Sequence, residues 1–115
     1  MNDHQPLVCD LTAIPADARQ QHLASIPELF GAVQAVQELP DGYAFRFDNE
    51  PGRFLALANF VEHEQLCCSF EGFAIEIEPH AGPIWLRLTG GEGVKEMLAA
   101  EVVHSPKKLQ INLDE

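Results

Sequence analysis

Three residues that lie close together in the chain have side chains that can bind a metal ion or take part in thiol chemistry. Glu64 is followed by Cys67 three positions later and by Cys68 four positions later. Residues with these spacings are neighbours on the surface of a helix, and thiolates prefer soft metal ions. The spacing predicts a thiol–carboxylate pocket containing Glu64, Cys67 and Cys68, which binds a soft metal ion, a metalloid or a small ligand.

The carboxylate of Glu64 lies within the apolar arc of this predicted helix, between Leu57 and Phe60. A carboxylate that faces a core needs a partner or a raised pKa. One interpretation gives Glu64 a cationic partner at the edge of the core, and the other places it in a functional pocket with the thiols. The candidate partners are Arg19, Arg46, Arg53, Arg87 and His22.

The two adjacent cysteines also have two interpretations. A free cysteine is often buried and packs as a small hydrophobic residue, so plain packing competes with a functional role. A disulfide between Cys67 and Cys68 is not expected, because successive side chains on a helix diverge. One ion held by both thiols would require the helix end to unwind. A site made of one thiol, Glu64 and a residue from elsewhere fits a regular helix better.

Two histidines are further candidates for the pocket. His63 lies four positions before Cys67 and can approach the thiols from the fringe as a metal ligand, although a solvated position is the more common one for such a residue. His22 lies on the apolar stripe of a helix predicted from Pro15 to Ile26. A single histidine on an apolar face is more often a hydrogen-bonded core residue than a ligand. Both interpretations of His22 therefore stay open.

The helix that positions the pocket is predicted between Pro51 and Gly72. Pro51 suits a first helical turn and Gly72 suits the position just after a helix, so we expect the helix to end near Glu71. One broad face of this segment is apolar and includes both cysteines. Such an amphipathic helix packs on a sheet or on other helices.

Alternating apolar residues on both sides of this helix predict two β-hairpins. One apolar face per strand indicates an α+β fold, a two-layer sandwich in which the two hairpins form a mostly antiparallel sheet with helices packed on one face. The expected strands are residues 32–39, 43–48, 73–78 and 84–89, and a last helix is expected at residues 94–103. We expect residues 1–104 to form a single domain and residues 105–115 to form a tail, as an edge strand or a loose end.

The composition limits the classes of partner. The formal net charge is −11 over 115 residues, and this charge repels phosphate backbones and anionic membrane surfaces. No apolar run is long enough for a membrane span, and the N-terminus lacks a signal pattern. We therefore expect a cytoplasmic protein that binds neither nucleic acid nor membranes. Three cysteines make no disulfide framework, so reduced thiols are expected. Cys9 is expected as a packing residue, with an approach to Cys67 or Cys68 as the alternative.

The run Glu64-Gln65-Leu66-Cys67-Cys68-Ser69-Phe70, followed by the segment 85–90 (WLRLTG) and a final helix, resembles a group of short uncharacterised bacterial proteins. Their pattern is E-x-x-C-C-x-F, then a β-hairpin, then L-x-x-T-G before a C-terminal helix. The resemblance adds Phe70 to the candidate positions and implies no reaction. Members of the group often have proline where this chain has Ser69 and arginine where it has Gln65.

Three functions follow from these observations as hypotheses. The first is a thiol–carboxylate site for a soft metal ion, a metalloid or a small ligand. The second is an enzyme with one cysteine as nucleophile or redox thiol and with Glu64 or His22 as base. The third is a non-catalytic interaction module, a homodimer joined through the sheet face near Trp85 or through the C-terminal tail.

Overall fold

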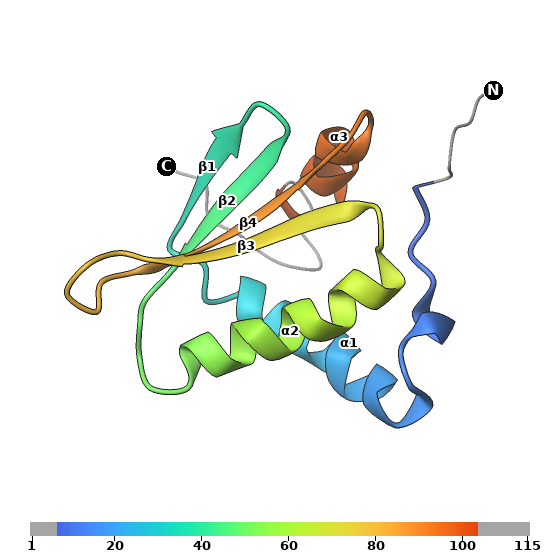
Figure 1. Cartoon of the computed structure of the whole chain (residues 1–115), viewed down its shortest axis with the longest axis horizontal. Coiled ribbons are helices and arrows are strands. Elements are labelled where there is room, and N and C mark those ends of the chain that lie inside the picture. The colour runs from blue at the N-terminus through green and yellow to red at the C-terminus, as the bar shows by residue number, and fades with distance from the viewer. Residues whose placement is uncertain (1–6, 104–115) are drawn as a thin grey trace.

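Two β-hairpins form a four-stranded antiparallel sheet in the computed structural model, which describes residues 7–103 (Figure 1). The strands are β1 (Ala35–Leu39), β2 (Gly42–Phe47), β3 (Glu71–Ile77) and β4 (Ile84–Gly90). Their order across the sheet is β1-β2-β4-β3, so the second strand of each hairpin lies at the centre. The two predicted hairpins are therefore confirmed and pair with each other through β2 and β4.

The two central strands bury one face of the sheet. Aromatic residues of β2 lie opposite aliphatic residues of β4, and all of them are buried. The alternation seen in the sequence places them on one face because successive side chains of a strand point to opposite sides. The three cross-strand pairs are Tyr43–Leu88, Phe45–Leu86 and Phe47–Ile84.

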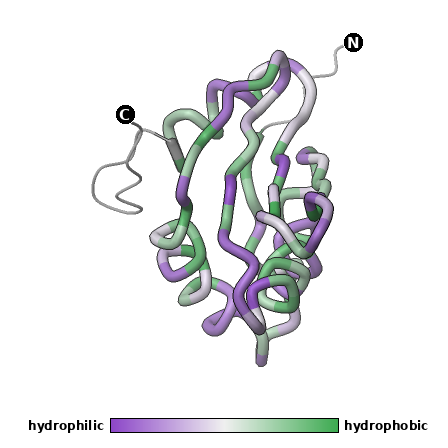
Figure 2. Tube along the Cα trace, turned by 90° about the vertical axis from the view of Figure 1, so that its left-hand side faces the viewer, coloured by the Kyte–Doolittle hydropathy of each residue, from purple (hydrophilic) through white to green (hydrophobic). Residues whose placement is uncertain are grey.

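The helices pack against this buried face, which confirms the predicted α+β sandwich. Buried residues from three helices belong to the same hydrophobic cluster as the inward side chains of the strands. In Figure 2 the trace changes repeatedly between hydrophobic and hydrophilic residues, as expected for elements that bury one side each. The helices are α1 (Ala16–Phe30), α2 (Arg53–Cys67) and α3 (Val94–Leu98), with a 3-10 turn η1 (Leu11–Ala13) before α1 and a π-helical turn η2 (Ala99–Val103) after α3.

The ring of Phe30 joins the helical layer to the sheet. It meets the ring of Phe45 edge-on at a centroid distance of 5.1 Å and that of Phe60 at 5.6 Å. Edge-to-face aromatic pairs are favourable beyond the area that they bury. Phe30 thereby fixes α1 and α2 over the same part of the sheet, where they lie side by side (Figure 1).

Helix α2 ends four residues earlier than the sequence predicts. The expectation that it reaches Glu71 and is closed by Gly72 was wrong, because these residues begin β3 and pair with Gly90 and Thr89 of β4. The hydrogen bonds of the sheet ladder replace those of the helix at this point. The early end of α2 determines how the two adjacent cysteines are placed.

Two other expectations concern membrane spans and a homodimer interface. No helix within residues 7–103 is long and apolar enough to cross a membrane. The predicted tail at 105–115 lies outside the described residues, so its role in a homodimer stays a prediction. Trp85, on the sheet face expected for such an interface, donates a hydrogen bond of 2.7 Å from Nε1 to Glu78.

Candidate functional site

The carboxylate of Glu64 contacts both cysteines at the end of α2. Its Oε2 lies 3.2 Å from the Cys68 sulfur, and its Oε1 lies 3.8 Å from the Cys67 sulfur. The two sulfurs are 3.6 Å apart. The structure thus brings together the three residues that the spacing selected.

A change of backbone conformation at Cys68 makes this convergence possible. Cys67 is the last helical residue, and Cys68 has φ −118° and ψ 65°, outside the helical region. Its N–H group still donates to the Glu64 carbonyl oxygen at 2.8 Å. Side chains of successive helical residues diverge, but Cys68 has left the helix, so both sulfurs can face the same carboxylate.

Cys9 completes the cluster from the other end of the chain. It forms a disulfide with Cys68 across 59 positions of sequence, while Cys67 remains a free, buried cysteine. The expectation of three reduced thiols was therefore wrong, and of the two interpretations of Cys9 the approach to Cys68 holds instead of plain packing. No local pattern around Cys9 indicates its partner, because the contact depends on how the N-terminal segment crosses the end of α2.

The N-terminal segment is held in place beside the disulfide by backbone and side-chain hydrogen bonds. The Asp10 N–H group donates to the Cys67 carbonyl oxygen at 2.8 Å. Arg19 of α1 donates from Nε to the carbonyl oxygens of Leu11 and Ile14, both at 3.0 Å. Ile14 is fully buried against the two adjacent cysteines. These contacts hold Cys9 over the end of α2.

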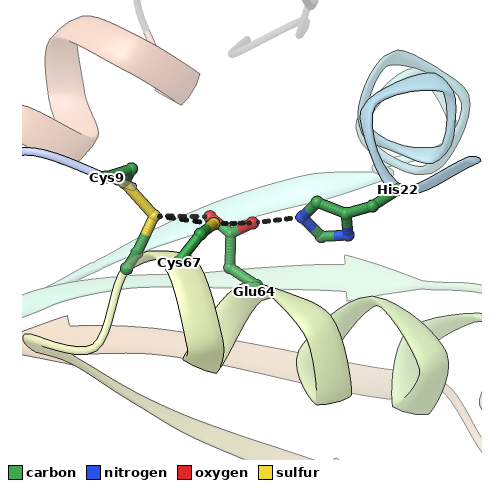
Figure 3. Close-up of a disulfide and its surroundings, with 5 residues drawn as sticks. Cys9, His22, Glu64 and Cys67 are labelled. Carbon is green, nitrogen blue, oxygen red and sulfur yellow. Dashed lines mark hydrogen bonds and ion pairs between the residues drawn. A yellow bond between two sulfur atoms is a disulfide. The ribbon is translucent and has the colours of Figure 1, made fainter. Parts of the chain in front are cut away.

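His22 is the one of the proposed partners that contacts Glu64. Its side chain is only 1% exposed, and Nε2 lies 2.6 Å from Glu64 Oε1. This contact is a hydrogen bond between the imidazole ring and the carboxyl group. The ring also stacks on Phe60, with centroids 5.5 Å apart. Both interpretations of Glu64 therefore describe parts of one arrangement, because it contacts the histidine and the sulfurs together (Figure 3).

Burial and negative charge act together on the titratable groups. Burial raises the pKa of the Cys67 thiol to about 12, and the nearby Glu64 carboxylate acts in the same direction. Burial is also the largest cause of the raised pKa of Glu71, which is about 8, and the nearby Glu64 and Glu101 raise it further. At neutral pH the thiol of Cys67 is therefore protonated, and Glu71 is mostly a neutral acid.

A cavity of about 610 Å³ adjoins this cluster. Its polar lining comes from His22, Glu64, Glu71, Glu101 and the three cysteines, and the rest of its lining is almost wholly hydrophobic. Helices α1 and α2, strand β4 and the C-terminal helical turns all contribute. Ligand pockets in proteins commonly have volumes of about 300–1,000 Å³, so this cavity has the size of a small-molecule site. Sequence reasoning did not find Glu71 or the apolar lining, since both depend on tertiary contacts.

Four residues of the cluster have atoms of types that bind metal ions, and these atoms lie close together. One ligand atom each from Cys9, Glu64, Cys67 and Cys68 lies within 4.8 Å of all the others. His63 is outside this set; its Nδ1 lies 3.0 Å from the Asn59 carbonyl oxygen. Phe70 packs against the core clusters. The structure thus places Cys9 beside Glu64, Cys67 and Cys68, whereas the candidates His63 and Phe70 are not part of this group.

No protein-family model, curated protein or solved structure matches this chain. The functional argument therefore depends on the geometry and chemistry of this site.

Proposed function

We propose that the reduced protein binds one soft metal or metalloid ion through Cys9, Cys67, Cys68 and Glu64. The observation that supports this function is the convergence of three sulfurs and one carboxylate oxygen within 4.8 Å. Three sulfur donors favour a soft ion over magnesium or calcium, which prefer oxygen ligands.

The spacing of the donors suits such an ion once the disulfide is opened. Two sulfurs that are each about 2.3 Å from a tetrahedral zinc ion lie about 3.8 Å apart. The sulfurs of Cys67 and Cys68 are already separated by 3.6 Å. After reduction, the Cys9 sulfur needs only a small movement away from the Cys68 sulfur, from bonding distance to the separation that Cys67 and Cys68 already have.

His22 acts on the site through Glu64. Residues that hydrogen-bond to a metal ligand fix its orientation, and their loss typically weakens metal binding by about 10–100-fold. The 2.6 Å contact between His22 Nε2 and Glu64 Oε1 suits this role, and the other oxygen, Oε2, is directed at the Cys68 sulfur. His22 is thus a positioning residue in the proposed site.

The test is a titration of the reduced protein with zinc, copper(I), mercury(II) and arsenite, followed by native mass spectrometry. We expect one ion per chain for at least one of them. Cys67→Ser and Cys68→Ser should each weaken that binding at least tenfold. Glu64→Gln should weaken it too, whereas Glu62→Gln, at an exposed position of the same helix, should not. Unchanged binding in both cysteine variants would refute the proposal.

A second function, thiol–disulfide exchange, is favoured by the disulfide itself. Cys9 is exposed and Cys68 is buried, so an external thiolate would attack the Cys9 sulfur and the Cys68 thiolate would leave. Glu64, 3.2 Å from that sulfur, would take up the proton released by the external thiol and pass it to the Cys68 sulfur. A second external thiol then releases Cys9, and two substrate thiols become one disulfide while the protein gains two electrons and two protons.

This second function predicts catalysis, which ion binding does not. The oxidised protein should accelerate the oxidation of a small dithiol, and Glu64→Gln should slow the reaction at least tenfold, with Glu62→Gln as the control. A rate equal to that of an equimolar inert disulfide would exclude it.

A further inference from the structure

The cavity beside the sulfur cluster is much larger than an ion needs. The four potential ligand atoms lie together at one wall of a space of about 610 Å³. Most of the remaining lining is hydrophobic, including Leu23, Ile26, Phe60 and Leu98. An ion bound at the sulfurs would leave nearly all of this apolar surface without a partner.

Two residues that line the same space each carry a buried polar atom without a hydrogen-bond partner among the described residues. Among the described residues, His22 Nδ1 and Glu71 Oε1 are buried without a hydrogen-bond partner, and both residues line the cavity. The His22 side chain is 1% exposed. Buried polar groups are nearly always paired in folded proteins, so these two residues have unused hydrogen-bonding capacity.

We infer that the site takes a soft element carrying an apolar organic group, with the element on the sulfurs and the organic group in the cavity. This inference rests on the proposed function and narrows its ligand class. Apolar cavities bind apolar groups readily, and one of about 150 Å³ is enough to bind benzene. A phenyl-sized substituent therefore fits the available space.

The binding step can be written for a monosubstituted arsonous acid, R–As(OH)2. An external dithiol or phosphine first reduces the Cys9–Cys68 disulfide, which takes up two electrons and two protons. The thiols of Cys67 and Cys68 then condense with the arsenic: two As–O bonds break, two As–S bonds form, and two water molecules leave. Glu64 contacts both sulfurs and can pass each thiol proton to a leaving hydroxyl group.

The test compares methylarsonous and phenylarsonous acid on the phosphine-reduced protein, because both bind two thiols and differ only in the organic group. The quantity compared is the ratio of the affinities for the phenyl and the methyl compound. We expect this ratio to be at least tenfold larger for the protein than for free dithiothreitol. Leu23→Trp, which places a large ring at the cavity wall, should remove most of this preference. Leu55→Trp is the matched control, because Leu55 is exposed like Leu23 but does not line the cavity.

The outcomes separate this inference from the proposed function. Equal preference in the protein and in dithiothreitol, or a preference that Leu23→Trp leaves intact, would overturn the inference while the soft-ion site stands. If neither arsonous acid nor any inorganic ion binds to the reduced protein, both the inference and the proposed function fail. A phenyl preference that is lost in Leu23→Trp and kept in Leu55→Trp supports the inference.

Discussion

Glu71 makes the stability of the fold depend on pH in a direction unusual for a carboxylate. Its pKa is about 8 in the folded protein, against an ordinary value of 4.5, because burial and then the charges of Glu64 and Glu101 disfavour ionisation. In the unfolded chain this carboxyl group ionises near its ordinary value. The folded state therefore binds one more proton between pH 4.5 and about 8, and stability falls as pH rises through this range.

The size of the effect follows from the interval between the two pKa values. Each pH unit within it costs about 1.4 kcal/mol per proton, so between pH 5.0 and 7.5 Glu71 lowers the free energy of unfolding by about 3 kcal/mol. Glu71→Gln keeps the shape of the side chain and cannot ionise. We expect the stability of the variant relative to the parent to grow by about 3 kcal/mol between pH 5.0 and pH 7.5.

The assay is urea unfolding of both proteins at several pH values with the disulfide intact. The quantity to compare is the difference in stability between variant and parent, because contributions from other groups cancel in it. Glu62→Gln serves as a control at an exposed position and should show no growing difference. A difference that is constant with pH would refute the reasoning about Glu71.

Three other predictions concern the disulfide, the free thiol and the centre of the sheet. The Cys9–Cys68 bond closes a loop of 59 positions, so its reduction should lower the free energy of unfolding by about 4 kcal/mol. Urea titrations with and without reductant measure this change, and equal unfolding midpoints would contradict the pairing. Cys67 is buried with a pKa of about 12, so only about one in 10,000 of its thiols is ionised at pH 8; iodoacetamide should label it, by mass spectrometry, only after denaturation. Gly42→Ala should destabilise the fold by about 3 kcal/mol or more, because a β-carbon at this position overlaps the Leu88 carbonyl oxygen. Gly91→Ala is the control, because a β-carbon there lies in open space. Thermal unfolding should show a loss of stability for the first variant and none for the second.

The fold could be predicted to the extent that it depends on local periodicity. The alternation of Tyr43, Phe45 and Phe47 defines a strand with one buried face, and the structure confirms that face. The pairing of β2 with β4 brings together segments about forty positions apart, and no local pattern indicates it. For the same reason the predicted end of α2 at Gly72 was wrong, because the cross-strand partner of that residue decides its conformation.

The candidate site also contains residues that local spacing predicts and residues that only tertiary contacts bring in. The spacing of Glu64, Cys67 and Cys68 follows from helical geometry, and these three residues do converge. Cys9 joins them because the N-terminal segment hydrogen-bonds to the end of α2, a contact that has no signature in the sequence. The sequence likewise gives no sign that Glu71, an acidic residue at the start of a strand, is buried, because its burial depends on tertiary contacts.

The disulfide and a bound ion compete for the same sulfurs, and this competition links the two functions proposed for the site. Opening the Cys9–Cys68 bond loses about 4 kcal/mol of stability through loop closure. An ion present at about 1,000 times its dissociation constant stabilises the reduced form by about 4 kcal/mol, which offsets that loss. For a two-electron couple the same free energy raises the reduction potential of the disulfide by about 90 mV. At any given solution potential a soft ion would therefore favour the reduced state of the site, and oxidation would release the ion.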